Sequence, residues 1–127
     1  MKDQINAVAT FHKAFKVEIA QSPTTNINKD IVELRHRLMS EENEEYIEAV
    51  KSNDLVEVAD ALGDMMYILC GTILTHGMQD IIETVFNEIQ QSNMSKLGVD
   101  GNPIYRNDGK VMKGPNYKRP NLKQFLD

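Results

Sequence analysis

The stretch that decides the fold is residues 41–64, which read EENEEYIEAVKSNDLVEVADALGD. It carries nine Asp and Glu residues against Lys51 alone, so its net charge is −8. Ser52-Asn53-Asp54 is typical of a break between helices, because small polar residues favour turns and helix caps. The sequence therefore predicts two acidic helices joined by a short turn.

The first of these helices is expected to begin near Asn28 or Asp30 and to run to about Lys51. Its N-terminal half has an apolar stripe at helical spacing, made of Ile31, Leu34 and Leu38. Continued by steps of three or four, the same stripe reaches Glu41 or Glu42, then Glu45 and Ala49. The face expected to be buried thus becomes acidic.

The second helix, expected to end near Thr75, is apolar around most of its circumference. Of the 20 residues from Leu55 to Leu74, 14 are apolar, and the only charged ones are Glu57, Asp60 and Asp64. These three share one face, because they are spaced three and four residues apart. Charged groups in such a place must be neutralised, paired or bound to a cation. Because Lys and Arg are scarce nearby, a metal ion is the simplest partner.

Carboxylates without His or Cys suit hard cations, chiefly Mg²⁺ or Mn²⁺, which bridge to phosphate oxygens. The pattern therefore favours a phosphate-bearing substrate. Runs of Glu are also common on solvated helix faces, and we assign Glu44 and Glu48 to such a face because they lie off the stripe. The partner of Asp64 is left open: it is a hydroxyl of the ligand, a nearby Lys or a second metal ion.

The remaining pattern predicts an all-α protein with a four-helix bundle-type core. The other two helices are expected over about Asp3 to Ile19 and about Met78 to Lys96. Asn107-Asp108-Gly109 lies between two short apolar segments, which indicates a small hairpin. We expect a single domain over residues 1–127, with a helical core (1–97) and an irregular or β-hairpin tail (98–127).

Composition narrows the class of protein. The chain has 127 residues, 41% of them hydrophobic, and the single Cys70 excludes an internal disulfide, which favours a reducing, cytoplasmic location. No membrane span is expected, since the most apolar helix carries three carboxylates. The net charge is −5; residues 94–127 are the most basic segment, at +4, and residues 1–40 carry +2. A nucleic-acid polymer is therefore a poor candidate partner.

These residues resemble the all-α nucleoside triphosphate pyrophosphohydrolases, a superfamily of MazG-like enzymes, dimeric dUTPases and phosphoribosyl-ATP pyrophosphohydrolases. Its mark is an ExxE pair on one helix and an ExxD pair on the next, here Glu42 to Glu45 and Glu57 to Asp60. The segment Asn93-Met94-Ser95-Lys96 and the tail motifs Asp108-Gly109-Lys110 and Lys113-Gly114-Pro115-Asn116-Tyr117 extend the likeness. The tail is most similar to the MazG-like branch that acts on dUTP or related nucleotides.

The resemblance implies Mg²⁺-dependent hydrolysis of an NTP or dNTP to the monophosphate and pyrophosphate, a reaction that cleans nucleotide pools. The implied metal ligands are Glu42, Glu45, Glu57 and Asp60. Glu41 is the implied supporting ligand or base for the attacking water. The residues expected to bind substrate are Asn93, Lys96, Asp64, Lys110 and Tyr117. Asn93 and Lys96 have a structural alternative, in which they satisfy the last carbonyls of the fourth helix.

Two other functions stay open at this stage. One is hydrolysis of phosphoribosyl-ATP in histidine synthesis, for which the extra tail is unexpected. The other is a non-catalytic helical module that binds a divalent ion or dimerises. The helix over about 55–75 has more apolar surface than one short chain covers, so we expect a homodimer or homotetramer.

Overall fold

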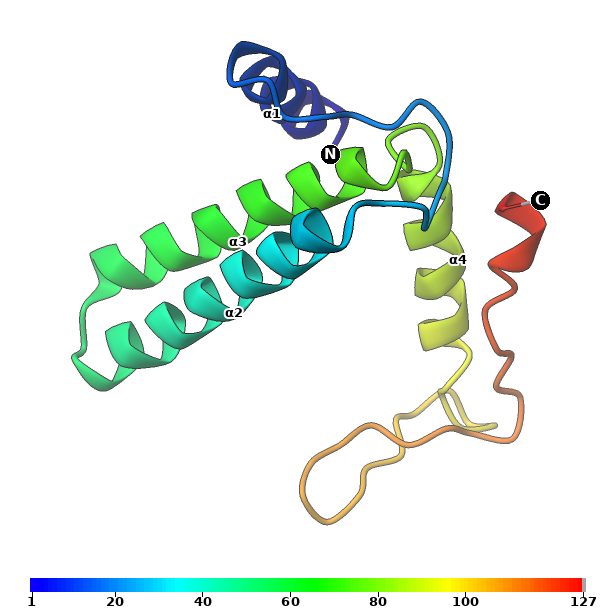
Figure 1. Cartoon of the computed structure of the whole chain (residues 1–127). Coiled ribbons are helices and arrows are strands. Elements are labelled where there is room, and N and C mark those ends of the chain that lie inside the picture. The colour runs from blue at the N-terminus through cyan, green and yellow to red at the C-terminus, as the bar shows by residue number, and fades with distance from the viewer. Residues whose placement is uncertain (127) are drawn as a thin grey trace. The chain divides into compact units, whose positions relative to one another are not determined.

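The computed structural model describes residues 1–126 and divides the chain into two compact units, Met1–Asp80 and the part from Ile81 onward. The described residues form four α-helices and no strand, so the predicted all-α class is confirmed (Figure 1). The helices are α1 (Lys2–Ala14), α2 (Lys29–Lys51), α3 (Leu55–Thr75) and α4 (Ile82–Met94), followed by a short 3-10 turn, Lys123–Phe125. The single-domain organisation stays a prediction.

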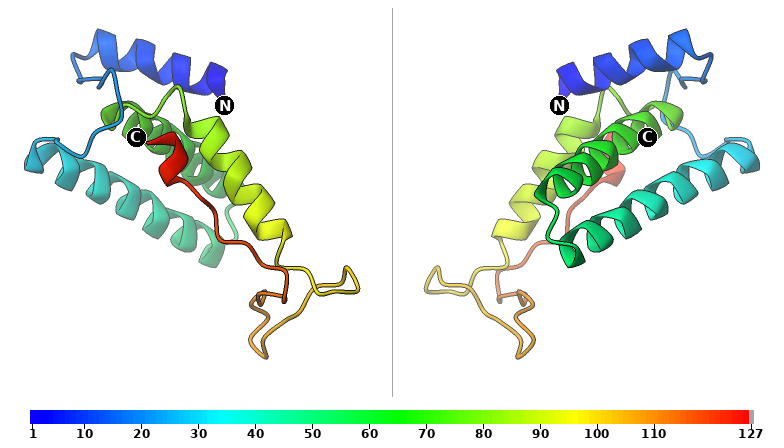
Figure 2. Two further views of the ribbon diagram at one scale, coloured as in Figure 1. Left: turned by 90° about the vertical axis from the view of Figure 1, so that its right-hand side faces the viewer. Right: turned by 90° about the vertical axis from the view of Figure 1, so that its left-hand side faces the viewer.

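The first unit is a helical hairpin with a third helix on one side. α2 and α3 run side by side in opposite directions, and α1 packs on α3 (Figure 1 and Figure 2). The apolar core is small, and its fully buried members are Ile5, Val8, Ala49, Ala61, Cys70, Ile73 and Leu74. α3 supplies most of them, as its apolar circumference predicts.

The ends of α2 and α3 lie where the sequence predicts them. Asn28 caps α2 by accepting a hydrogen bond from the Asp30 amide at 2.8 Å, and Asp54 caps α3 in the same way. Two residues after the last residue of α2 and of α3, the backbone turns left-handed, at Asn53 (φ 54°) and at Gly77 (φ 69°). Asn and Gly adopt this conformation at low cost, so both ends were readable in the sequence.

Two helices are shorter than predicted. α1 ends at Ala14 rather than near Ile19, because Lys16 takes the left-handed conformation (φ 57°) and the Val17 amide donates to the His12 carbonyl at 2.8 Å. This is the same type of C-terminal cap, built on a residue that carries no sequence signal for it. α4 begins at Ile82 rather than near Met78, after a turn that follows the Gly77 cap.

In the described part of the chain, α3 alone is long and apolar enough to span a membrane by length and composition. The core helix of a soluble protein passes the same test. α3 also carries Glu57, Asp60 and Asp64, and ionised groups are costly at bilayer depth.

The second unit contains α4 and a tail that folds back along it. The Gly114 amide donates to the Lys96 carbonyl at 2.8 Å, and the Asn121 amide donates to the Glu88 side chain at 2.9 Å. An antiparallel bridge joins Tyr105 to Val111, so the predicted hairpin is present as a single pair.

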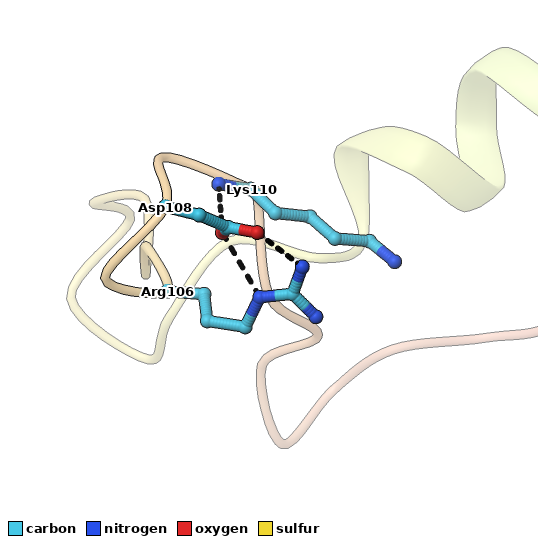
Figure 3. Close-up of polar contacts among 3 residues, drawn as sticks. All are labelled: Arg106, Asp108 and Lys110. Atoms are coloured by element: carbon cyan, nitrogen blue, oxygen red, sulfur yellow. Dashed lines mark hydrogen bonds and ion pairs between the residues drawn. The ribbon is translucent and has the colours of Figure 1, made fainter.

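Figure 3 shows how the turn of this hairpin is held together. Oδ1 of Asp108 accepts from Arg106 Nε at 2.9 Å and from the Lys110 amide at 3.1 Å, while its second oxygen contacts the Arg106 guanidinium. Gly109 has a φ of +87°, which only glycine adopts readily. The turn therefore uses Asp108 and Gly109, two of the three residues that predicted it.

Candidate functional site

The two acidic pairs lie on the facing helices of the first unit. Glu42 and Glu45 are on α2, and Glu57 and Asp60 are on α3, close to the turn that joins the helices. A hollow of about 570 Å³ opens at this end of the hairpin and is lined by three of the four, namely Glu45, Glu57 and Asp60. Glu44, Glu48 and Asp54 also line it, so its wall is strongly acidic.

Glu42 lies one helical turn from Glu45, towards the interior of the hairpin. Its Oε2 atom is buried and has no hydrogen-bond partner among the described residues. Burial raises the pKa of Glu42 to about 7, with further contributions from Glu45, Asp64 and Asp60. These three carboxylates are thus close enough to Glu42 to oppose its ionisation. We call Glu42, Glu45, Glu57, Asp60 and Asp64 the acidic cluster.

The acidic cluster fits a hard divalent cation by its chemistry. A buried carboxylate oxygen without a donor is costly, and repulsion between like charges adds to that cost. A cation removes both penalties at once, and all the available ligands are oxygens, as Mg²⁺ prefers. Within residues 1–126, no three Asp, Glu, His or Cys side chains are gathered closely enough to hold an ion as they stand. Ion binding would therefore draw the exposed members of the cluster inward.

Glu41, the predicted base, lies beside the cluster on an exposed part of α2. Its Oε1 atom is 4.0 Å from Arg37 Nε, an ion pair of the kind that neighbouring helical turns form. Glu41 does not line the acidic hollow. Glu48 is similarly exposed and lies 3.7 Å from the Lys51 ammonium, in keeping with the solvated role expected of it.

Four of the predicted substrate-binding residues lie in the second unit. Asn93 is exposed on α4, and Lys96 follows the helix end. In the described part of the chain, neither side chain donates a hydrogen bond, so the structural alternative of capping the last carbonyls of α4 is not realised there. Lys110 is exposed in the hairpin. The Lys113 ammonium lies over the ring of Tyr117, 5.0 Å from the ring centre.

Sequence reasoning overlooked Arg35, a half-buried cation on α2. Its Nε atom is buried and has no hydrogen-bond partner among the described residues. The available signal was its place between Leu34 and Leu38, beside the apolar stripe and seven residues before Glu42. A cation at that position faces the same side of the helix as the acidic pair.

Comparison with known proteins gives two findings. Residues 8–93 match the family model described as phosphoribosyl-ATP pyrophosphohydrolase. The fold is similar to a crystal structure from Exiguobacterium sp. 255-15, described as that of a candidate NTP pyrophosphohydrolase, with 25% identity and a TM-score of 0.50. The match covers 97% of this chain and 90% of that one. A search of curated protein sequences gives no match.

Proposed function

This chain belongs to the phosphoribosyl-ATP pyrophosphohydrolase family, within the all-α nucleoside triphosphate pyrophosphohydrolases, and we propose that it is a Mg²⁺-dependent hydrolase that converts an NTP or dNTP to the monophosphate and pyrophosphate. The observation that carries this proposal is the buried, partnerless oxygen of Glu42 within the acidic cluster. Mn²⁺ is an alternative metal, because it takes the same oxygen ligands.

In the proposed site, Glu42, Glu45, Glu57 and Asp60 hold the metal. Bound Mg²⁺ would neutralise charge on the phosphate oxygens as the reaction proceeds. Glu41 orients a water molecule and accepts its proton, while the water oxygen attacks phosphorus and the bond between the α- and β-phosphates breaks. The electron pair of that bond leaves with pyrophosphate. The exposure of Glu41 leaves it free to turn towards such a water.

The proposal also includes the predicted substrate-binding residues. Lys96 and Lys110 supply positive charge for the phosphates, as cations commonly do in phosphoryl transfer. Asn93 and Asp64 hydrogen-bond the sugar or a phosphate, and Tyr117 packs against the nucleotide. dUTP and related nucleotides are the substrates that the tail motifs favour, and cleaning of nucleotide pools in the cytoplasm is the corresponding role.

Phosphoribosyl-ATP is a second candidate substrate, because the matching family model carries its name. The match ends at residue 93, so it leaves the tail unaccounted for. Pyrophosphate release from dUTP, the other dNTPs, the NTPs and phosphoribosyl-ATP, measured with and without Mg²⁺, tests both substrates together. If the folded protein turns over none of these nucleotides, the proposal that it is an enzyme is refuted. The remaining proposal is then a non-catalytic module that binds a metal ion or dimerises.

We also propose that the protein is a homodimer or homotetramer. α3 exposes a row of apolar residues at helical spacing, with Leu55 80%, Leu62 49%, Met66 48% and Leu69 44% exposed. An apolar face of this length is usually covered by another protein surface. Light scattering at micromolar concentration should give a multiple of 14.4 kDa, and a mass of 14.4 kDa would contradict the proposal.

A further inference from the structure

A second hollow lies in the first unit, away from the acidic one. It has a volume of about 590 Å³ and is formed by the segment after α1, the first turns of α2 and the last turn of α3. Its apolar wall includes Val17, Ile19, Ile27, Ile31 and Leu34. Its polar groups include two cations, Lys16 and Arg35, one carboxylate, Glu18, and the amide of Asn26. Apolar walls with a few polar groups are typical of small-molecule sites.

Arg35 is the unusual member of this hollow. None of the described carboxylates forms an ion pair with it, and its buried Nε atom has no acceptor. His12, beside it, is 2% exposed, and burial together with the Arg35 charge lowers the pKa of His12. Neither form of the imidazole is negatively charged, so His12 offers Arg35 no counter-charge. A buried donor without a partner costs free energy, which an acceptor from a ligand would recover.

Gly71 on α3 makes room for the Arg35 guanidinium. A Cβ atom at Gly71 would lie 2.9 Å from Arg35 Nη1 and 2.9 Å from His12 Nε2. Both contacts are shorter than real Cβ atoms make, so glycine at this position lets the guanidinium rest against the helix backbone. The Arg35 guanidinium thus packs against α3 and His12 in the ligand-free protein.

Arg35 also stands in register with the metal site. It precedes Glu42 by seven residues of the same helix, which is two turns and about 10 Å along the axis. Side chains seven residues apart point in nearly the same direction. This spacing is comparable with the span from the α-phosphate to the far edge of the base in an extended nucleotide, so a nucleotide with its phosphates at Glu42 can present its base to Arg35.

We propose that Arg35 reads the nucleobase and selects guanine, hypoxanthine, uracil and thymine over adenine and cytosine. The selected bases carry a keto oxygen at purine position 6 or pyrimidine position 4, where adenine and cytosine carry an amino group. This inference rests on the proposed function and deepens it. A guanidinium only donates hydrogen bonds, so it satisfies a keto oxygen and clashes electrostatically with an amino group. Keto bases also carry a ring N–H beside the keto oxygen, and Glu18 and Asn26 provide acceptors for it. The apolar wall accommodates the flat ring.

The test compares kcat/KM for matched pairs, dGTP with dATP and dUTP with dCTP, in the wild type, Arg35→Met and Arg35→Lys. We expect the wild type to favour the keto member by about tenfold or more, and Arg35→Met to bring the ratio close to one. Arg35→Lys keeps the charge but loses the planar fork, so an intermediate ratio is expected. Lys29→Met is the control, because Lys29 is an exposed cation on the same helix, paired with Glu33 at 3.6 Å.

Because each ratio is taken on one preparation, a partly unfolded variant lowers both rates and leaves the ratio unchanged. A wild type without keto preference, or an Arg35→Met variant with the wild-type ratio, would overturn the inference. Calorimetric binding of dUMP and dCMP measures the same preference without turnover. Loss of turnover with an intact dUMP preference would refute the proposed reaction alone, and equal binding of dUMP and dCMP would refute the role of Arg35.

Discussion

Replacing Glu42 by Gln should make the metal-free protein more stable and the metal-bound protein less so. The carboxyl has a pKa raised from 4.5 to about 7, through burial and the charges of Glu45, Asp64 and Asp60. The folded state therefore holds this proton more tightly than the unfolded chain does. Stability of the metal-free protein falls as the pH rises from about 4.5 through about 7, where the folded carboxyl ionises. Gln has the same shape and no charge to lose.

The size of the effect follows from the shift. Without solvent screening, a pKa difference of this size means that ionised Glu42 destabilises the folded state, relative to the unfolded chain, by about 3 kcal/mol. Solvent around the exposed neighbouring carboxylates screens the repulsion, so we expect Glu42→Gln to gain about 1–2 kcal/mol at pH 8. For a chain of this length that is a rise of about 5 °C in Tm. At pH 4, where both states are protonated, the gain should vanish.

Thermal unfolding followed by circular dichroism, at pH 4 and pH 8, with EDTA or with Mg²⁺, measures all of this. Wild type should gain stability on adding Mg²⁺ at pH 8, and Glu42→Gln should gain much less. Glu33→Gln is the matched control, since Glu33 is 57% exposed, lies on the same helix and forms an ion pair with Lys29. If Glu42→Gln melts like the wild type in EDTA and responds equally to Mg²⁺, Glu42 is neither crowded nor a metal ligand.

Three further outcomes are expected. Glu57→Gln should lower pyrophosphate release by orders of magnitude with the helical circular dichroism spectrum unchanged, and full activity at ordinary Mg²⁺ would remove Glu57 from the site. Lys96→Ala should raise KM or lower kcat far more than Lys118→Ala. Truncation after Leu97 should raise KM without weakening Mg²⁺ binding. If all three changes have equal, negligible effects, the tail is only a solubilising surface. Gly77→Ala should lower the free energy of unfolding, measured in urea, by more than about 2 kcal/mol. The reason is that φ is +69° at Gly77 and that a Cβ atom there would overlap a backbone carbonyl oxygen. A near-neutral result would contradict the role of Gly77 in the cap.

The α2–α3 hairpin was predictable because every local signal in it agrees. Ser52-Asn53-Asp54 supplies a left-handed residue at Asn53 and a cap at Asp54, and apolar periodicity fixes which faces meet. The end of α1 was not predictable by the same rules. Lys16 has no preference for the left-handed conformation. The apolar residues Phe15 and Ile19 keep the helical spacing beyond Ala14, where α1 ends. Tertiary contacts of the next segment decide where that helix ends.

The acidic cluster shows the same division between pattern and packing. Helical spacing placed Glu42, Glu45, Glu57 and Asp60 on facing helices, because spacing determines direction. It did not show that Glu42 is the member with a buried oxygen, which depends on how deeply each side chain lies between α2 and α3. Arg35 escaped notice for a related reason. One cation in a helix is ordinary by composition, and only its missing partner in three dimensions makes it distinctive.

The small core and the acidic cluster together explain why ligands should matter to the stability of this protein. α3 leaves much of its apolar surface exposed, burial and the neighbouring carboxylates oppose the ionisation of Glu42, and the buried Nε atom of Arg35 has no acceptor among the described residues. Each of these costs is relieved by a different partner: a divalent ion for the carboxylates, a second copy for the α3 face, and a base with a keto oxygen for Arg35. Anything that binds only the folded state stabilises it by RT ln(1 + L/Kd), where L is the free ligand concentration. Stability should therefore rise in steps as Mg²⁺ and then nucleotide are added, and the step due to nucleotide should be larger for dUMP than for dCMP in the wild type but not in Arg35→Met.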